Sequence, residues 1–227
     1  MTALGKAIAK GYKATHDGVT KLYRKTTNVF GMSSDELIAS GDDVVRRFLQ
    51  RSQKFDDLVA KYGDDILQFK PQGLNPNEIP QSLYNDMLSK YSPLLSDAKK
   101  KEFLNGLIKS GSDIPVKNIV NQGEELVKIV PAGKDPGLSS FFMSKSEFAK
   151  LKTSGNLEQK LGLPISSHAP KYDVFKITAT KQTTIYNSTV AETIQNGYRT
   201  TGGATQSLVP DVTNGWSTPE LIESFIP

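Results

Sequence analysis

The sequence predicts an α+β protein, with a helical N-terminal region over residues 1–125 and a compact β-rich C-terminal domain over residues 126–227. Apolar residues keep helical spacing from Val45 to Tyr62, which predicts an amphipathic helix. Residues 172–179 instead alternate in period two and are rich in β-branched and aromatic side chains, which predicts a strand. Between these parts, residues 110–137 are dense in glycine and proline and predict a linker or a change of architecture.

Capping signals place the other helices. Ser33 and Glu36 have the spacing of a capping box, with the serine at the cap and the glutamate three residues on. One helix is expected after Pro80, and another is expected to start at the cap residue Ser96. A short helical stretch is expected between residues 144 and 161.

Two further strands complete the predicted C-terminal domain. The segments 183–186 and 189–191 predict one strand, interrupted by a bulge, and residues 206–210 predict the next. Strands that follow a run of helices favour a compact α+β arrangement.

Composition narrows the chemistry. The chain has 227 residues and no cysteine, which excludes disulfides, thiolate catalysis and cysteine-ligated zinc. Its two histidines, His16 and His168, lie far apart in the sequence, so we expect no metal site. The lack of cysteine suits a cytosolic protein or a secreted protein that must unfold and cross membranes, and the N-terminus lacks the apolar core of a signal peptide.

The formal net charge of +4 is unevenly distributed. Residues 1–25 carry six basic residues against one acid, so this segment could contact a membrane during delivery or could be a solvated terminal helix. Beyond it the charges are mixed, and no stripe of arginine and aromatic residues predicts a nucleic-acid partner.

A glycine pair near the C-terminus is the strongest candidate for a ligand loop. Gly202 and Gly203 lie in a polar loop, and Gln206 follows three residues later, before the apolar pair Leu208 and Val209. Paired glycines let a backbone turn tightly and approach a ligand, because no Cβ is in the way. A glutamine at this place can aim an amide into whatever the loop encloses. A plain hairpin turn would have the same residues.

Five short segments occur in an order that resembles a known family. They are an aromatic strand at 138–144, the segment 159–167, the strand at 172–177, the tripeptide at 189–191 and the loop at 202–206. This order resembles the C-terminal NAD glycohydrolase domain of the tuberculosis-necrotizing-toxin type, found in bacterial polymorphic toxins. The resemblance covers about residues 130–227. It implies a reduced ADP-ribosyltransferase-like β-core that holds NAD+ in a cleft.

The resemblance also implies roles for particular residues. Gln206 falls on the catalytic glutamine of the family. Lys134 and Lys160 fall where the family has arginines, and lysine keeps the charge but lacks the bidentate fork that holds a pyrophosphate. We expect no cofactor, because NAD+ is then the substrate. The predicted substrate-binding residues are Lys134, Phe142, Lys160, His168, Tyr172, Gly202 and Gly203.

The resulting prediction is a bacterial toxin that hydrolyses NAD+ to nicotinamide and ADP-ribose and is secreted or delivered into the cytosol of a target cell. The helical N-terminal region would serve delivery or docking, and the resemblance implies a cognate immunity protein as partner. Three alternatives stay open: an ADP-ribosyltransferase toxin that modifies a macromolecule, a toxin nuclease, and a non-enzymatic interaction module in which the glycine pair is only a turn.

Overall fold

The computed structural model of the chain describes residues 43–137 and 139–227. Contacts divide the chain into Met1–Leu49 and Gln50–Pro227, and all the features below belong to the second unit unless stated. The predicted capping box at Ser33 and the basic segment 1–25 lie outside the described residues.

The predicted helices form, with one change. Helix α5 begins directly after Ser96, whose hydroxyl accepts a hydrogen bond from the backbone N–H of Lys99 at 3.4 Å. The helical stretch predicted at 144–161 is two helices, because Gly155 adopts a left-handed conformation with φ 68° and ends the first. The helices are α3 (Asp43–Tyr62), α4 (Gln81–Ser89), α5 (Asp97–Lys109), α6 (Lys145–Ser154) and α7 (Leu157–Lys160), with short 3-10 turns at Ile66–Gln68, Pro76–Glu78 and Ile165–Ser167.

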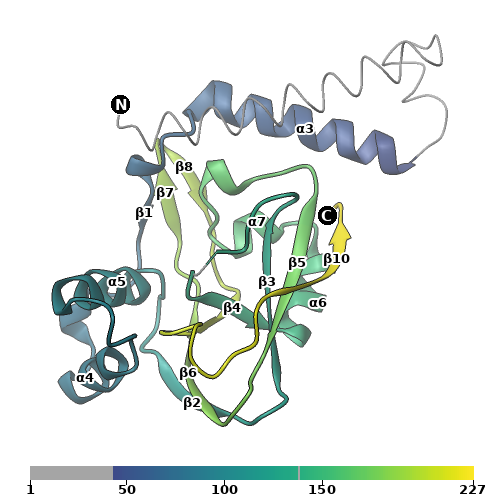
Figure 1. Cartoon of the computed structure of the whole chain (residues 1–227). Coiled ribbons are helices and arrows are strands. Elements are labelled where there is room, and N and C mark those ends of the chain that lie inside the picture. Colours follow the sequence, from purple (N-terminus) through teal and green to yellow (C-terminus); the bar gives the residue numbers. More distant parts are fainter. Residues whose placement is uncertain (1–42, 138) are drawn as a thin grey trace. The chain divides into compact units, whose positions relative to one another are not determined.

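The strands form two antiparallel sheets (Figure 1). The seven-stranded sheet has the order β10-β5-β3-β4-β9-β6-β2, and the three-stranded sheet has the order β1-β7-β8. The strands predicted at 172–179 and 206–210 are confirmed, and 183–189 is one continuous strand. Their bounds are Lys70–Pro71 (β1), Val116–Val120 (β2), Glu125–Pro131 (β3), Phe141–Ser144 (β4), Tyr172–Thr178 (β5), Thr183–Thr189 (β6), Thr193–Gln195 (β7), Tyr198–Thr200 (β8), Thr205–Leu208 (β9) and Glu220–Phe225 (β10).

Of the two alternatives predicted for the glycine- and proline-rich stretch 110–137, the structure shows the change of architecture, from helices to strands, and not a linker. It contains β2 and β3, and β3 pairs with β5 over seven residues, from Glu125 opposite Thr178 to Pro131 opposite Tyr172. Gly123 (φ 89°) and Gly133 (φ 77°) stand in the turns on either side of β3, where a left-handed residue is needed. The glycines therefore mark the ends of a central strand, which pairs with the next strand, β4, on one side and with the more distant β5 on the other.

The predicted boundary at residue 126 does not coincide with the division in the structure. Helices α4 and α5 bury their apolar faces on β6 and β9, where Met87 and Leu104 share one cluster with Tyr186 and Leu208. The Tyr186 hydroxyl also donates to a carboxylate oxygen of Asp86 in α4, at 2.8 Å. Strands β1 and β2 pair with β7 and β6 in the two sheets. The segment 70–125 thus belongs to the same folded unit as the C-terminal sheet.

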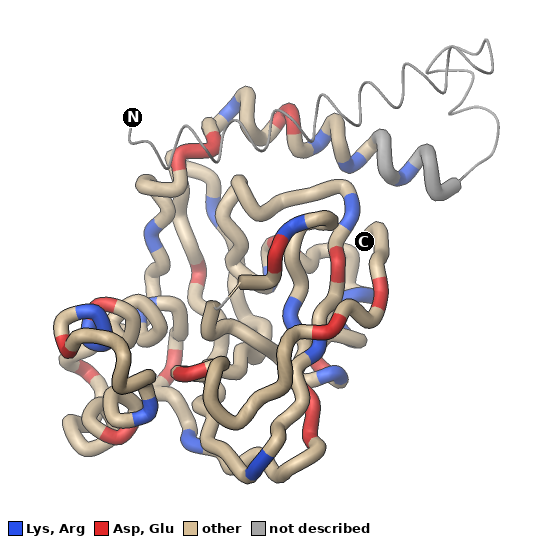
Figure 2. The backbone as a smooth tube through the Cα atoms, in the orientation of Figure 1, with Lys and Arg blue, Asp and Glu red and all other residues tan. Residues whose placement is uncertain are grey.

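Charges are mixed over the described chain. Figure 2 shows Lys and Arg interspersed with Asp and Glu along the backbone. The ion pairs follow this mixture; Glu125, for example, contacts both Lys145 and Lys176. No helix among the described residues is long and apolar enough to span a membrane.

We predict that a fragment of residues 126–227 does not fold cooperatively. Removing the preceding segment uncovers Tyr186 and Leu208 and leaves β6 without β2. Each large apolar side chain returned to water costs about 1.5–3 kcal/mol, and a domain is stable by only about 5–15 kcal/mol in total. Thermal unfolding followed by circular dichroism tests this, with residues 50–227 as the matched fragment that retains a sharp transition. A sharp transition for 126–227 near that of 50–227 would restore the boundary at residue 126.

Candidate functional site

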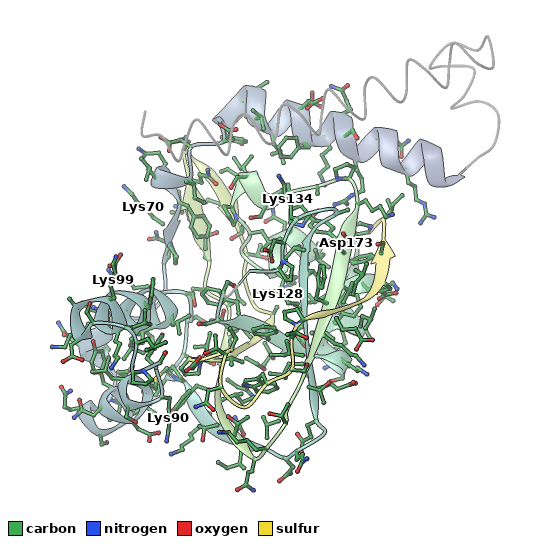
Figure 3. All side chains as sticks on the ribbon, in the orientation of Figure 1. Lys70, Lys90, Lys99, Lys128, Lys134 and Asp173 are labelled. Carbon is green, nitrogen blue, oxygen red and sulfur yellow. The ribbon has the colours of Figure 1, made fainter. Side chains whose placement is uncertain are left out.

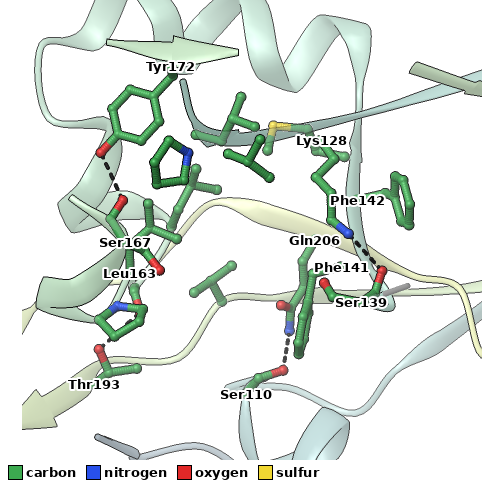
Figure 4. Close-up of a pocket in the computed structure, with 18 of the residues that line it drawn as sticks. Ser110, Lys128, Ser139, Phe141, Phe142, Leu163, Ser167, Tyr172, Thr193 and Gln206 are labelled. Atoms are coloured by element: carbon green, nitrogen blue, oxygen red, sulfur yellow. Dashed lines mark hydrogen bonds between the residues drawn. The ribbon is translucent and has the colours of Figure 1, made fainter. Parts of the chain in front are cut away.

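A cavity of about 440 Å³ opens beside the junction of the two sheets. Figure 4 shows its walls, which come from β3, β4 and β9, from the segment after α7 and from the end of α5. The volume falls within the ~300–1,000 Å³ typical of small-molecule sites. Most of the wall is apolar, contributed by Phe69, Ile129, Phe141, Phe142, Met143, Leu161, Leu163 and Val190. The wall contains few polar groups, so the position of each one strongly affects which ligands the cavity can bind.

Gln206 is held rigidly at the cavity wall. It lies on β9 and its side chain is only 5% exposed. Its amide Nε2 donates to Ser110 Oγ at 3.0 Å and to Ser188 Oγ at 2.9 Å. No donor among the described residues contacts its Oε1. The two serines thus use both amide protons and leave the carbonyl oxygen as the group free to meet a ligand.

Ser110 reaches Gln206 because several backbones converge there. It follows the last residue of α5, and its hydroxyl donates to the carbonyl oxygen of Leu107 at 2.6 Å. The next residue, Gly111, has no Cβ; a Cβ there would lie 2.8 Å from Ser188 Oγ, too close for ordinary packing. The sequence analysis missed both serines, because lone serines are common and nothing local connects them to Gln206.

Lys128 is a second polar residue of the cavity that the sequence analysis missed. It is 6% exposed, in the middle of β3, and its Nζ donates to the carbonyl oxygens of Pro136 and Ser139, each at 2.9 Å. Figure 3 shows Lys128 among the strands, with Lys134 in the turn beyond β3. The available signal was a lysine between apolar residues in the run Leu126 to Val130.

The two predicted aromatic residues, Phe142 and Tyr172, line the cavity. Phe142 is buried, with its ring centroid 4.7 Å from Lys128 Nζ. Tyr172 is fully buried, and its hydroxyl donates to Glu158 Oε1 at 3.0 Å. Burial and the nearby Glu158 carboxylate raise the pKa of Tyr172 well above its ordinary value, so its hydroxyl stays protonated. Tyr172 therefore offers the cavity an apolar ring rather than an acid.

Five of the seven predicted substrate-binding residues lie outside the lining of this cavity: Lys134, Lys160 and His168, and the two glycines described below. Lys134 is exposed in the turn after β3. Lys160 ends α7, and its Nζ lies 3.7 Å from where a Cβ of Gly203 would be. His168 is buried beside a separate hollow of about 130 Å³. Burial lowers the pKa of His168, and its Nε2 has no hydrogen-bond partner among the described residues.

The glycine pair was predicted to approach a ligand closely. In the structure it instead approaches the backbone of other segments of the protein. Gly202 (φ 62°) donates its N–H to Gln159 O at 3.0 Å, and Gly203 (φ 93°) donates to Val190 O at 2.9 Å. A Cβ on Gly202 would lie 2.3 Å from Val190 O. Both glycines lie outside the lining of the cavity, and their conformation directs the chain into β9, which carries Gln206.

Acidic groups near the site are engaged by the protein itself. Glu158 forms an ion pair with Arg51 and accepts from Tyr172, and these contacts hold the pKa of Glu158 low although burial opposes this. Within residues 43–137 and 139–227, no group of three or more His, Asp or Glu side chains is placed to hold a metal ion.

Two solved structures show partial similarity to the chain. A chain in the structure of Rhs1-CT in complex with the cognate immunity protein RhsI1 is 17% identical, with 53% of this chain and 86% of that chain covered and a TM-score of 0.38. A chain in the structure of Tse6 in complex with Tsi6 is 13% identical, with 62% and 96% covered and a TM-score of 0.34. Both TM-scores lie below 0.5, a level that does not establish a common fold. No family model and no curated protein matches the chain.

We predict that Gly202→Ala destabilises the protein more than Gly203→Ala. Both substitutions place a side chain in left-handed backbone, at a cost of about 1–2 kcal/mol. Only at Gly202 does the new Cβ also meet backbone atoms, the carbonyl groups of Val190 and Ala191. Urea unfolding of the two variants measures the difference. Equal losses of unfolding free energy would show that the close approach to Val190 has no energetic weight.

Proposed function

We propose that this protein is a bacterial toxin that hydrolyses NAD+ to nicotinamide and ADP-ribose at the cavity beside Gln206. The observation that carries the proposal is the amide of Gln206: two serine hydroxyls hold its Nε2, which leaves its carbonyl oxygen to a mostly apolar cavity of the size typical of small-molecule sites. The order of sequence segments resembling NAD glycohydrolase toxins supports the same substrate. Secretion or delivery into the cytosol of a target cell, and a cognate immunity protein as partner, are parts of this proposal.

The proposed reaction demands little acid–base chemistry. The bond between nicotinamide nitrogen and ribose carbon breaks, and the electron pair leaves with neutral nicotinamide. The ribose then carries oxocarbenium-like positive charge, as in glycoside cleavage. A water oxygen adds to that carbon and releases one proton, giving ADP-ribose. Nicotinamide departs without protonation, so the protein must chiefly orient the ribose and the water.

Several groups of the cavity support this proposal. The Gln206 Oε1 can accept a hydrogen bond from a ribose hydroxyl or from the attacking water, and its fixed dipole places negative charge near the developing cation. The ring of Phe141, which is partly exposed in the cavity wall, offers a surface for an aromatic base. The apolar wall limits the water that reaches the reacting carbon.

We predict that Gln206→Ala reduces NAD+ turnover by about a hundredfold or more, the typical effect of removing a preorganised polar group. Because Gln206 is buried with two hydrogen bonds, the variant should also lose about 1–3 kcal/mol of unfolding free energy. Nicotinamide release, followed by chromatography at a temperature where both proteins are folded, separates the two effects.

Gln195→Ala is the matched control for Gln206→Ala. Gln195 is also buried and also makes two hydrogen bonds, from Ile165 N and to Asp65 O, but outside the cavity. It should lose stability while keeping turnover. Wild-type turnover by Gln206→Ala would remove the basis of the proposal. Nicotinamide release that requires an added protein or nucleic acid would point to a transferase instead.

We predict that Ser110→Ala and Ser188→Ala each lower kcat by about tenfold, the value of one hydrogen bond of about 1.4 kcal/mol. Each removes one of the two hydroxyls that accept from the Gln206 amide. The double variant should approach the activity of Gln206→Ala, since the three side chains act as one unit. Ser112→Ala, an exposed serine two residues from Ser110, is the control and should leave kcat unchanged. Steady-state kinetics measures kcat for each variant. An unaffected kcat in Ser110→Ala would show that the hydrogen bond from the Gln206 amide to Ser110 is not needed for turnover.

A further inference from the structure

Lys128 carries a charge in a place that disfavours charge. Lys128 lines the cavity among apolar side chains, and burial lowers its pKa to about 8, while the Asp135 carboxylate acts in the opposite direction. A buried ammonium is costly unless it is paired or strongly hydrogen bonded. Lys128 stands in a strand whose neighbouring residues, Val127 and Ile129, are apolar, so its charge needs a structural or functional reason.

The protein itself accounts for only part of the bonding capacity of Lys128. An ammonium has three N–H donors, and two are used by the carbonyl oxygens of Pro136 and Ser139. The Phe142 ring faces the same ammonium. Among the described residues no carboxylate forms an ion pair with Lys128: Asp135 instead accepts from Gly137 N, and Glu158 pairs with Arg51. One donor, and a positive charge that no carboxylate among the described residues neutralises, remain for a ligand in the cavity.

We propose that Lys128 binds a phosphate group of the ligand in this cavity and makes the site selective for phosphate-bearing ligands over the corresponding nucleosides. This inference rests on the proposed function for the identity of the ligand, since NAD+ and ADP-ribose both contain a pyrophosphate. It transfers the anion-binding role from Lys134 and Lys160, which lie outside the cavity, to a residue inside it. The Gln206 amide and the Lys128 ammonium then bind the same ligand at two points.

A purely structural role for Lys128 makes a different prediction. Its two hydrogen bonds tie the carbonyl groups of Pro136 and Ser139 to β3. If that were its whole role, removing the ammonium would weaken binding of every ligand alike. Phosphate recognition instead predicts a loss confined to ligands that carry phosphate, because a charged hydrogen bond disappears only for them.

Isothermal titration of ADP-ribose and adenosine into the full chain distinguishes these roles. At pH 7, Lys128→Met should weaken ADP-ribose binding by roughly 10–100-fold, the range of a charge-assisted hydrogen bond, and leave adenosine binding within about twofold. Lys128→Arg should retain most of the preference for ADP-ribose. Lys134→Met is the matched control, because Lys134 is exposed outside the cavity, and both affinities should stay unchanged.

The pH dependence of binding supplies an independent readout. Lys128 has a lowered pKa of about 8, so the cation is present below that pH and is lost above it. Tyr172, the other titratable side chain in the lining of the cavity, has a pKa raised well above its ordinary value and stays protonated in this range. Wild-type affinity for ADP-ribose should fall between pH 7 and pH 9.5, and the profile of Lys128→Met should be flat.

Two results would overturn the inference: equal losses for ADP-ribose and adenosine in Lys128→Met, or wild-type protein that binds ADP-ribose no better than adenosine. Its failure differs from failure of the proposed function. If the protein binds ADP-ribose through Lys128 but releases no nicotinamide from NAD+, the phosphate-binding role of Lys128 stands and the proposed hydrolase activity is wrong. If the protein turns over NAD+ and Lys128→Met keeps the wild-type preference for ADP-ribose over adenosine, the hydrolase activity stands and the phosphate-binding role of Lys128 is wrong.

Discussion

The packing of α4 and α5 on β6 and β9 is the constraint on which the candidate site depends. This contact buries Leu104 against Leu208, and it sets the end of α5 beside β9. Ser110 can therefore reach the amide of Gln206, although 96 residues separate them along the chain. Without the helix pair, Gln206 would lose one of the two hydroxyls that orient it, and Leu208 on the same strand would lose its apolar cover.

Two polar side chains of the cavity, Gln206 and Lys128, are each held by two hydrogen bonds. A side chain held by two bonds loses little further entropy when a ligand arrives, so its interaction energy is available for binding or for the transition state. Gln206 is held through its Nε2 by two serines, and Lys128 is held through its Nζ by two carbonyl oxygens. In both residues the remaining polar capacity is left to the cavity. A few fixed polar groups of this kind suit a reaction that depends on orienting the substrate more than on proton transfer.

The glycine loop and the buried Glu158 support the site from outside the cavity. Gly202 lets the chain pass against Val190 and enter β9 in the register that places Gln206 beside Ser188. Glu158, neutralised by Arg51, fixes the hydroxyl of Tyr172 and so the ring that faces the cavity. His168, which the sequence suggested as a ligand-binding residue, lies in the separate hollow beside this ion pair. These contacts shape the cavity without offering it a charged group.

The sequence by itself determined the features that depend on local physics. The alternation at 172–178 is a strand, Ser96 caps a helix, and Gln206 follows a glycine turn that needs positive φ, because periodicity, capping and steric freedom are properties of neighbouring residues. The tertiary structure alone decided which distant segments meet. Residues 116–131 look like a linker until β5 and β6 provide hydrogen-bond partners, and Lys128 looks like a surface residue until β3 becomes a central strand. Ser110 and Ser188 meet Gln206 for the same reason. Strand pairing and helix packing bring together residues that are far apart in the sequence, and no local sequence pattern indicates which residues will meet.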